Sequence, residues 1–251
     1  MPRTADLLGP SKERPGDNLG TVPIFAQRKW DCPPLGCRII PDVLTGSLVA
    51  AGLLAISLLA PTEKTMGDAQ RILYVHVAAA WCGLAGFLIV AASGLLYLLR
   101  RDLGWDHWAQ AAAEMAWLCC GLTLITGSFW AHAAWNTWWT WEPRLAATAI
   151  LWAVSSGYLI VRSGVEDPHR RARMGAVLAL VAAADIPLVV MATRWFRGIH
   201  PAAPQMDPAM RLVLLLSIVG FSAFFGLLLV RRRGQLRLES LLGALEREID
   251  G

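Results

Sequence analysis

Residues 130–144 read WAHAAWNTWWTWEPR and hold five of the 12 tryptophans of the chain. The stretch lies between two long apolar runs, so it is expected at a membrane surface. A broad, rigid aromatic face there would hold a large flat ligand by stacking and by burial of apolar surface. The residues predicted to form this face are Trp135, Trp138, Trp139 and Trp141.

A second interpretation of the stretch needs no ligand. Trp is enriched at membrane interfaces, where its apolar ring and its N–H donor are both accommodated. If the stretch is helical, Trp135, Trp138, Trp139 and Glu142 share one face. A helix lying flat on the membrane would show the same pattern.

The composition indicates an integral membrane protein. Of the 251 residues, 55% are hydrophobic and 17% are charged, against about 25% charged in soluble domains. The apolar runs are long rather than alternating, which favours helices over a barrel. The net charge of +4 is scattered, so it does not indicate nucleic-acid binding. The five cysteines form neither a CxxC redox motif nor a CxxCH haem-attachment motif.

The sequence predicts an all-α membrane protein built as a bundle of six transmembrane helices. At about 1.5 Å per residue, each apolar run can cross a hydrocarbon core of about 30 Å. The runs are 43–60, 72–99, 112–130, 145–161, 175–193 and 212–230. The predicted organisation is a flexible N-terminal tail (1–41), the six-helix domain (42–231) with the Trp-rich outer loop 130–144, and a C-terminal tail (232–251) with a short amphipathic stretch.

The distribution of basic residues predicts that both termini are cytoplasmic, because Lys and Arg accumulate on the inner side of membrane proteins. With that orientation, 17 of the 23 basic residues lie inside. The six outer ones are Lys64, Arg71, Arg144, Arg194, Arg197 and Arg211.

This topology also sorts the histidines. His76 falls near the outer end of the second run, His200 lies in the last outer loop and His132 stands beside the Trp stretch, while His107 and His169 fall inside. Two neutral imidazoles make a six-coordinate iron. A flat aromatic platform with His76 and His200 as axial metal ligands therefore suggests haem b (iron protoporphyrin IX). Without the Trp stretch, the better interpretation is that His76 is a hydrogen-bonded residue at a helix end and that His200 is a loop residue.

Two segments, YVHVAAAW (74–81) and WNTWWTWEPRL (135–145), resemble a known family. They are similar to the C component of the bacterial cytochrome c maturation system, the CcmC or haem exporter protein C family. This family belongs to a superfamily of haem-handling proteins marked by an outer loop of WGxWWxWDxR type, the WWD motif. The resemblance covers about residues 60–230. Six helices and one Trp motif separate the chain from larger relatives with more helices and more histidines.

The resemblance implies a role for each matching residue. His76 and His200 match the two axial histidines of the family. The motif residues that imply cofactor binding are Trp135, Trp138, Trp139, Trp141, Glu142 and Arg144. The anionic haem propionates need cationic partners, since guanidinium groups bind carboxylates at two points. The outer arginines available for this are Arg144, Arg71, Arg194 and Arg197.

The chain departs from the family pattern at two motif positions. Asn136 stands where the motif has Gly, and Glu142 stands where it has Asp. The longer Glu arm changes the reach of the carboxylate. Asn tolerates positive φ better than most residues, so it can replace a Gly that needed such a backbone.

The function implied by the resemblance is haem binding at the outer face of the bacterial inner membrane and delivery of haem during c-type cytochrome biogenesis. The implied partners are a periplasmic CcmE-like haem chaperone, an ABC transporter complex with a small membrane subunit (CcmA-, CcmB- and CcmD-like) and membrane lipid, with no nucleic acid. The sequence leaves open whether the protein also assists covalent attachment of haem to the chaperone and so acts as an enzyme.

Three rival functions remain at the level of sequence. One is a haem transporter that moves haem across the membrane with an ABC complex, although the chain has no nucleotide-binding Gly-rich loop of its own. Another is a b-type electron carrier, which would need histidines near the middle of facing helices. The third is a structural membrane anchor, which leaves the Trp cluster and the outer histidines unexplained.

Overall fold

The computed structural model describes residues 35–63, 66–196, 198 and 206–250. The chain divides into two units, Met1–Arg38 and Ile39–Gly251, and the helical bundle belongs to the second. Within the described ranges, six helical segments are long and apolar enough to cross a membrane. The predicted fold, an all-α membrane protein with six transmembrane helices, is confirmed.

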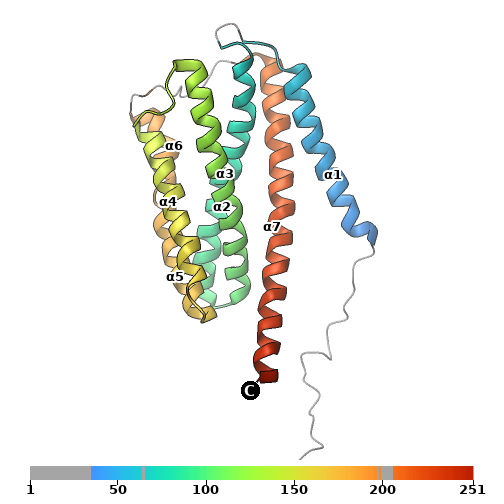
Figure 1. Cartoon of the computed structure of the whole chain (residues 1–251), viewed down its shortest axis with the longest axis vertical. Coiled ribbons are helices and arrows are strands. Elements are labelled where there is room, and N and C mark those ends of the chain that lie inside the picture. The colour runs from blue at the N-terminus through green and yellow to red at the C-terminus, as the bar shows by residue number, and fades with distance from the viewer. Residues whose placement is uncertain (1–34, 64–65, 197, 199–205, 251) are drawn as a thin grey trace, which may run out of the picture. The chain divides into compact units, whose positions relative to one another are not determined.

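The spans follow one another along the chain with short connections (Figure 1). They are α1 (Leu35–Leu54) with the π-helical turn η1 (Ala55–Leu59), α2 (Arg71–Arg100) after the 3-10 turn η2 (Asp68–Gln70), α3 (Leu103–Trp135), α4 (Pro143–Ser163), the pair α5 (Pro168–Ala183) and α6 (Ile186–Trp195), and α7 (Pro208–Asp250).

The ends of the helical region lie further out than the apolar runs indicate. Helix α1 begins at Leu35, so residues 35–41 are helical rather than part of a loose tail. The predicted tail of residues 1–34 lies outside the described residues. Helix α7 continues past Arg231 to Asp250, because residues 231–250 contain no Pro and many strong helix formers.

Helices α2 and α3 form a tight antiparallel pair at the centre of the bundle. Arg101 ends α2 in the left-handed region (φ 56°), and its N–H donates to the Tyr97 carbonyl at 2.7 Å. Asp102 then caps α3 by accepting from the Gly104 N–H at 2.7 Å. Small residues let the two helices approach closely: a Cβ at Gly86 would lie 2.8 Å from the Ala116 Cβ.

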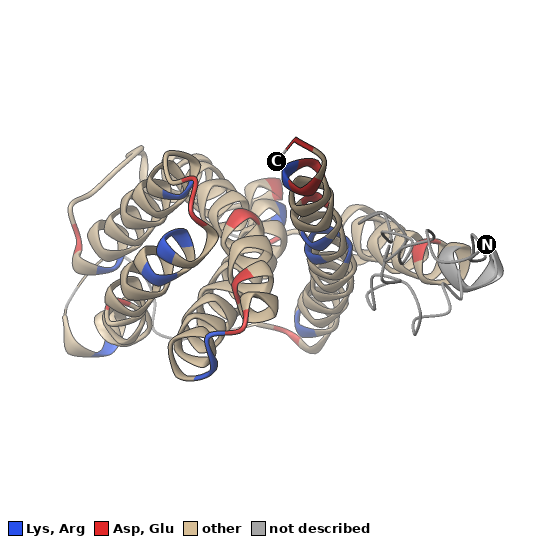
Figure 2. Ribbon diagram, turned by 90° about the horizontal axis from the view of Figure 1, so that it is seen from below, with Lys and Arg blue, Asp and Glu red and all other residues tan. Residues whose placement is uncertain are grey.

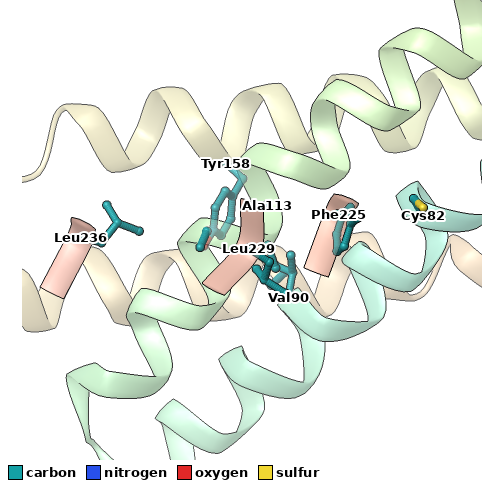
Figure 3. Packing of buried hydrophobic residues seen from close by; sticks show 10 residues of the cluster. Cys82, Val90, Ala113, Tyr158, Phe225, Leu229 and Leu236 are labelled. Carbon is teal, nitrogen blue, oxygen red and sulfur yellow. The ribbon is translucent and has the colours of Figure 1, made fainter. Parts of the chain in front are cut away.

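A buried apolar cluster joins these helices to the rest of the bundle (Figure 3). It includes Val90 of α2, Ala113 of α3, Tyr158 of α4 and Phe225 and Leu229 of α7. Helix α1 packs on α7 through Gly220, where a Cβ would lie 3.0 Å from the Leu48 carbonyl oxygen. Helices α2, α3, α4 and α7 thus share one core, which holds their ends in register.

The fifth span is broken. Helix α5 ends at Ala183, and α6 starts at Ile186 after a turn through Asp185. Pro187 has no N–H to continue the helical ladder, so the break follows from the sequence. The Oδ2 atom of Asp185 is buried without a hydrogen-bond partner among the described residues.

The two ends of the bundle differ in chemistry. We call the end that carries the 136–142 loop the site end. Near the opposite end, Arg162 of α4 binds Asp106 of α3 through two hydrogen bonds of 2.6 and 2.8 Å, and Gln110 accepts a third at 2.9 Å. His107 and His169 also lie towards this end, at the starts of α3 and α5, as the topology predicts. Figure 2 looks onto this end and shows Arg positions at several helix termini.

Candidate functional site

The Trp-rich stretch is a short loop between two helices. Helix α3 ends at Trp135, and Asn136 adopts the left-handed conformation (φ 52°) with its N–H donating to the His132 carbonyl at 2.9 Å. Helix α4 restarts at Pro143, a favoured first helical residue. Residues 136–142 are therefore not helical, and the alternative of a flat interfacial helix is wrong. This left-handed conformation is one that Gly adopts readily at the end of a helix, and Asn136 stands where the family motif has Gly.

The four tryptophans of the motif point in different directions. Trp135 packs on Trp130, with ring centroids 5.0 Å apart and planes at 65°. Trp138 lies 4.0 Å from the His132 ring. Trp141 is 82% exposed and meets Trp139 edge-on at 81°. Because the ring planes of Trp139 and Trp141 lie at 81° to each other, at least these two rings do not belong to the single flat face that the sequence predicts.

A cavity lies beside the loop, between α2, α3, α4 and α6; the space there that protein atoms do not fill is about 740 Å³, part of it open to solvent. Three predicted site residues line it together: His76, Trp139 and Arg144. Its deeper walls are apolar and include Phe87 and Leu151. His76 and Phe87 are eleven residues apart on α2, so the cavity extends about 16 Å along the helix, roughly half the thickness of a hydrocarbon core.

His76 is held on the second turn of α2 against α3. Its Nδ1 lies 3.1 Å from the Thr126 Oγ1. A Cβ at Gly127 would come within 2.9 Å of the His76 Cε1, so the absence of a side chain at 127 makes room for the imidazole. The Trp130 ring lies 6.4 Å from the imidazole and is tilted by 31°.

A cationic side chain and an N–H donor line the same cavity as His76. Arg144 lines the cavity, and no described carboxylate forms an ion pair with it within 4.0 Å. The Trp139 Nε1–H is buried without a hydrogen-bond partner in the described part of the chain. A buried donor without a partner costs free energy. The Arg144 guanidinium and the Trp139 N–H therefore suit an anionic group of a bound ligand.

Glu142 connects the loop to the segment after α6. A Cβ at Gly198 would clash with the Glu142 carboxylate, which places the two residues in contact. Glu142, Arg144, Phe196 and Gly198 also surround a small pocket of about 180 Å³. His200 and Arg197, two further candidates from the sequence, lie outside the described residues. The other two candidate arginines are not among the described residues that line the cavity: Arg71 pairs with Asp68 at 3.4 Å, and Arg194 lies in the last turn of α6.

The sequence did not reveal the α3 residues that surround His76. Thr126 and Gly127 lie about fifty positions further along the chain and carry no motif. Their role depends on the antiparallel pairing of α2 and α3. His132 was placed beside the Trp stretch without a role, and it packs against Trp138.

The fold and site define a multi-pass helical membrane protein with a largely apolar cavity between four of its helices. The chain belongs to the haem exporter protein C family, whose profile, described as "Heme exporter protein C", matches residues 35–242. It is 32% identical to the "Heme exporter protein C" of Paracoccus denitrificans over 220 residues, which are 84% of this chain and 91% of the relative. It is 31% identical to the protein of the same name from Rhodobacter capsulatus over 222 residues, 84% and 92% of the two chains.

A more distant relative carries a name that specifies a process. The chain is 28% identical over 169 residues, 66% of this chain and 72% of the relative, to a "cytochrome c biosynthesis ccmC-like mitochondrial protein" of Marchantia polymorpha.

Proposed function

We propose that the protein binds haem in the cavity beside the Trp loop and delivers it to a haem chaperone during c-type cytochrome biogenesis. The observation that carries this proposal is the meeting of His76, Trp139 and Arg144 on one largely apolar cavity in a member of the haem exporter protein C family. Ligand pockets are typically lined by apolar side chains with a few polar groups, and this cavity has that composition.

The residues present fit haem as cargo. The apolar walls suit a macrocycle, and the Arg144 guanidinium with the Trp139 N–H suits propionates. Haem supplies an iron that accepts axial imidazoles, for which His76 is one candidate. His200 is the proposed second ligand. In support, Gly198, two positions before it, contacts Glu142 of the loop.

Two ligands from separate segments suit a protein that gives its cargo away. His76 belongs to α2, which is fixed in the core, whereas His200 belongs to the connection between α6 and α7. One histidine can therefore hold the iron while the other releases it. Glu142 and the exposed Trp138 and Trp141 belong to the same proposed binding region, where their rings offer contact surface to the cargo or to the chaperone.

The proposed location is the bacterial inner membrane, with the site end in the periplasm and both termini in the cytoplasm. The supporting observation is the excess of basic residues at the opposite end. The proposed partners are the periplasmic chaperone, an ABC complex and its small membrane subunit. The names of the relatives, which describe a haem exporter, support an assembly of this kind.

An absorption spectrum of the protein purified in detergent tests the proposal. We expect the wild type to carry six-coordinate haem, and His76→Ala and His200→Ala each to lose or alter it. His107→Ala, at the opposite end of the bundle, is the matched control and should retain the wild-type spectrum. Wild-type protein without haem after co-expression with the chaperone would refute the proposal.

Transport of haem across the membrane is the second candidate, because the cavity reaches deep into the bundle. It is bounded there by the buried Phe87, which also lines a second, much smaller pocket together with Tyr158. Haem flux into vesicles that contain only this protein would favour transport. Absence of flux, together with haem transfer to the chaperone, would favour delivery.

A further inference from the structure

The hydrogen bond between α2 and α3 at His76 fixes more than the position of the ring. The Thr126 Oγ1 lies 2.7 Å from the Leu122 carbonyl oxygen, one turn earlier on α3, and 3.1 Å from the His76 Nδ1. A hydroxyl group has one hydrogen to donate and two lone pairs that accept. The short contact to the Leu122 carbonyl uses that hydrogen, because a carbonyl can only accept.

The Thr126 oxygen can therefore only accept from His76, which makes Nδ1 the nitrogen that carries the proton. In a neutral imidazole the other nitrogen, Nε2, then carries the lone pair. A lone pair at Nε2 is what a metal ligand requires, and hydrogen bonding at the second nitrogen is the usual way in which proteins select that tautomer.

Gly127 supports the same arrangement by its lack of a side chain. A Cβ there would approach the His76 Cε1 to 2.9 Å and the Nδ1 to 3.3 Å. The imidazole thus lies on the bare backbone of α3 beside the Thr126 hydroxyl. The orientation of the ring and its tautomer are both set by two consecutive residues of the neighbouring helix.

We infer that Thr126 is a positioning residue for the haem ligand His76: its hydroxyl holds the imidazole in the tautomer that presents Nε2 and, through the Nδ1–H bond, raises the electron donation of the ligand. The inference rests on the proposed haem site. A hydrogen bond from Nδ1–H gives the imidazole partial imidazolate character, which stabilises ferric over ferrous iron. Loss of this bond should therefore raise the reduction potential of the haem.

The test compares two variants that separate shape from hydrogen bonding. Thr126→Val keeps the branched shape and removes the hydroxyl, whereas Thr126→Ser keeps the hydroxyl and removes the methyl group. Outer partners of metal ligands typically contribute about 10- to 100-fold in affinity. We expect Thr126→Val to release haem about 10- to 100-fold faster and to raise its reduction potential, and Thr126→Ser to restore both towards the wild type.

Further variants guard against a purely structural effect. Thr126→Ala removes the hydroxyl without bulk, so it replaces Thr126→Val if the latter fails to fold. Ser217 of α7 does not line the cavity, and its buried hydroxyl donates to the Val213 carbonyl of its own helix at 2.9 Å. Ser217→Ala should therefore leave the rate of haem release and the reduction potential unchanged.

The outcomes distinguish the inference from the proposed function. One outcome would overturn the role of Thr126 alone: the wild type carries haem and His76→Ala loses it, but Thr126→Val keeps the wild-type release rate and reduction potential. Absence of haem from the wild type would overturn the haem site and this inference together. A changed release rate with an unchanged potential would reject the tautomer argument and leave Thr126 with a packing role.

Discussion

The buried ion pair between Asp106 and Arg162 gives the sharpest prediction for the stability of the bundle. Both side chains are 4% exposed, and they join α3 to α4 through two hydrogen bonds. A Cβ at Gly175 would lie 2.7 Å from the Arg162 Nη1, so α5 also closes over the pair. Removing one partner leaves an uncompensated buried charge, which costs about 3–5 kcal/mol.

We therefore expect Asp106→Leu and Arg162→Leu each to lower the free energy of unfolding by about 3–5 kcal/mol. The double variant should lie within about 1–2 kcal/mol of the wild type, because paired apolar replacements of buried ion pairs are often close to neutral. The two single costs would thus fail to add.

Denaturant unfolding in detergent micelles, followed by helical circular dichroism, measures these differences. The matched control is Asp42→Leu, which removes an ion pair with Arg231 whose partners are 40% and 49% exposed. An exposed pair contributes about 0–1 kcal/mol, so the control should change little. If the two single variants cost no more than the control, the pair is hydrated and the reasoning from burial is wrong.

Four further predictions concern the site and its supports. Arg144→Ala should weaken haem retention about 10- to 150-fold, because hydrogen bonds to charged groups contribute about 1.5–3 kcal/mol; transfer to apomyoglobin measures it, and Arg144→Lys should fall between the two. Leu151 lines the cavity and is 1% exposed, so the larger side chain of Leu151→Trp should occupy the cavity and abolish haem binding; retained binding would place the ligand elsewhere. Asn136→Ala should lower stability by about 1 kcal/mol and Asn136→Gly should not, since φ is 52° there; equal thermal midpoints would contradict this. Gly86→Val should destabilise the bundle by about 1–3 kcal/mol, because its Cβ position lies 2.8 Å from Ala116 and 2.9 Å from Phe225; an unchanged denaturation midpoint would show that α2 and α3 can separate there.

The helical bundle could be predicted from local sequence because membrane spans are a local property. About twenty consecutive apolar residues must form a helix in lipid, where each backbone polar group needs an internal partner. The break near Asp185 was not predicted, because hydropathy gives residues 175–193 as one run, although Pro187 cannot donate to the helical ladder. The extra turns of α1 and the long α7 were missed because hydropathy marks the membrane core, whereas helices continue into polar sequence.

For the Trp loop, some features follow from the sequence and others depend on tertiary packing. Its position between two spans follows from the sequence, as does the tolerance of Asn136 for positive φ. The directions of its rings do not follow, because they depend on packing partners from the preceding helix. Trp135 packs against Trp130, and Trp138 packs against Phe129 and His132. Only Trp139 of the motif tryptophans lines the cavity with His76 and Arg144.

By itself, the sequence determined the membrane class, the six spans, the family and the chemical identities of the candidate ligands. These depend on residue types, on spacing within one helix or loop, and on charge at the ends of apolar runs. The tertiary structure decided which groups meet: the cavity between four helices, the Thr126 hydroxyl at His76, and the Asp106–Arg162 pair across 56 positions. The physical reason is that contacts between helices depend on axial register and rotation. Those are set by close packing at small residues such as Gly86 and Ala116, and no local pattern encodes them.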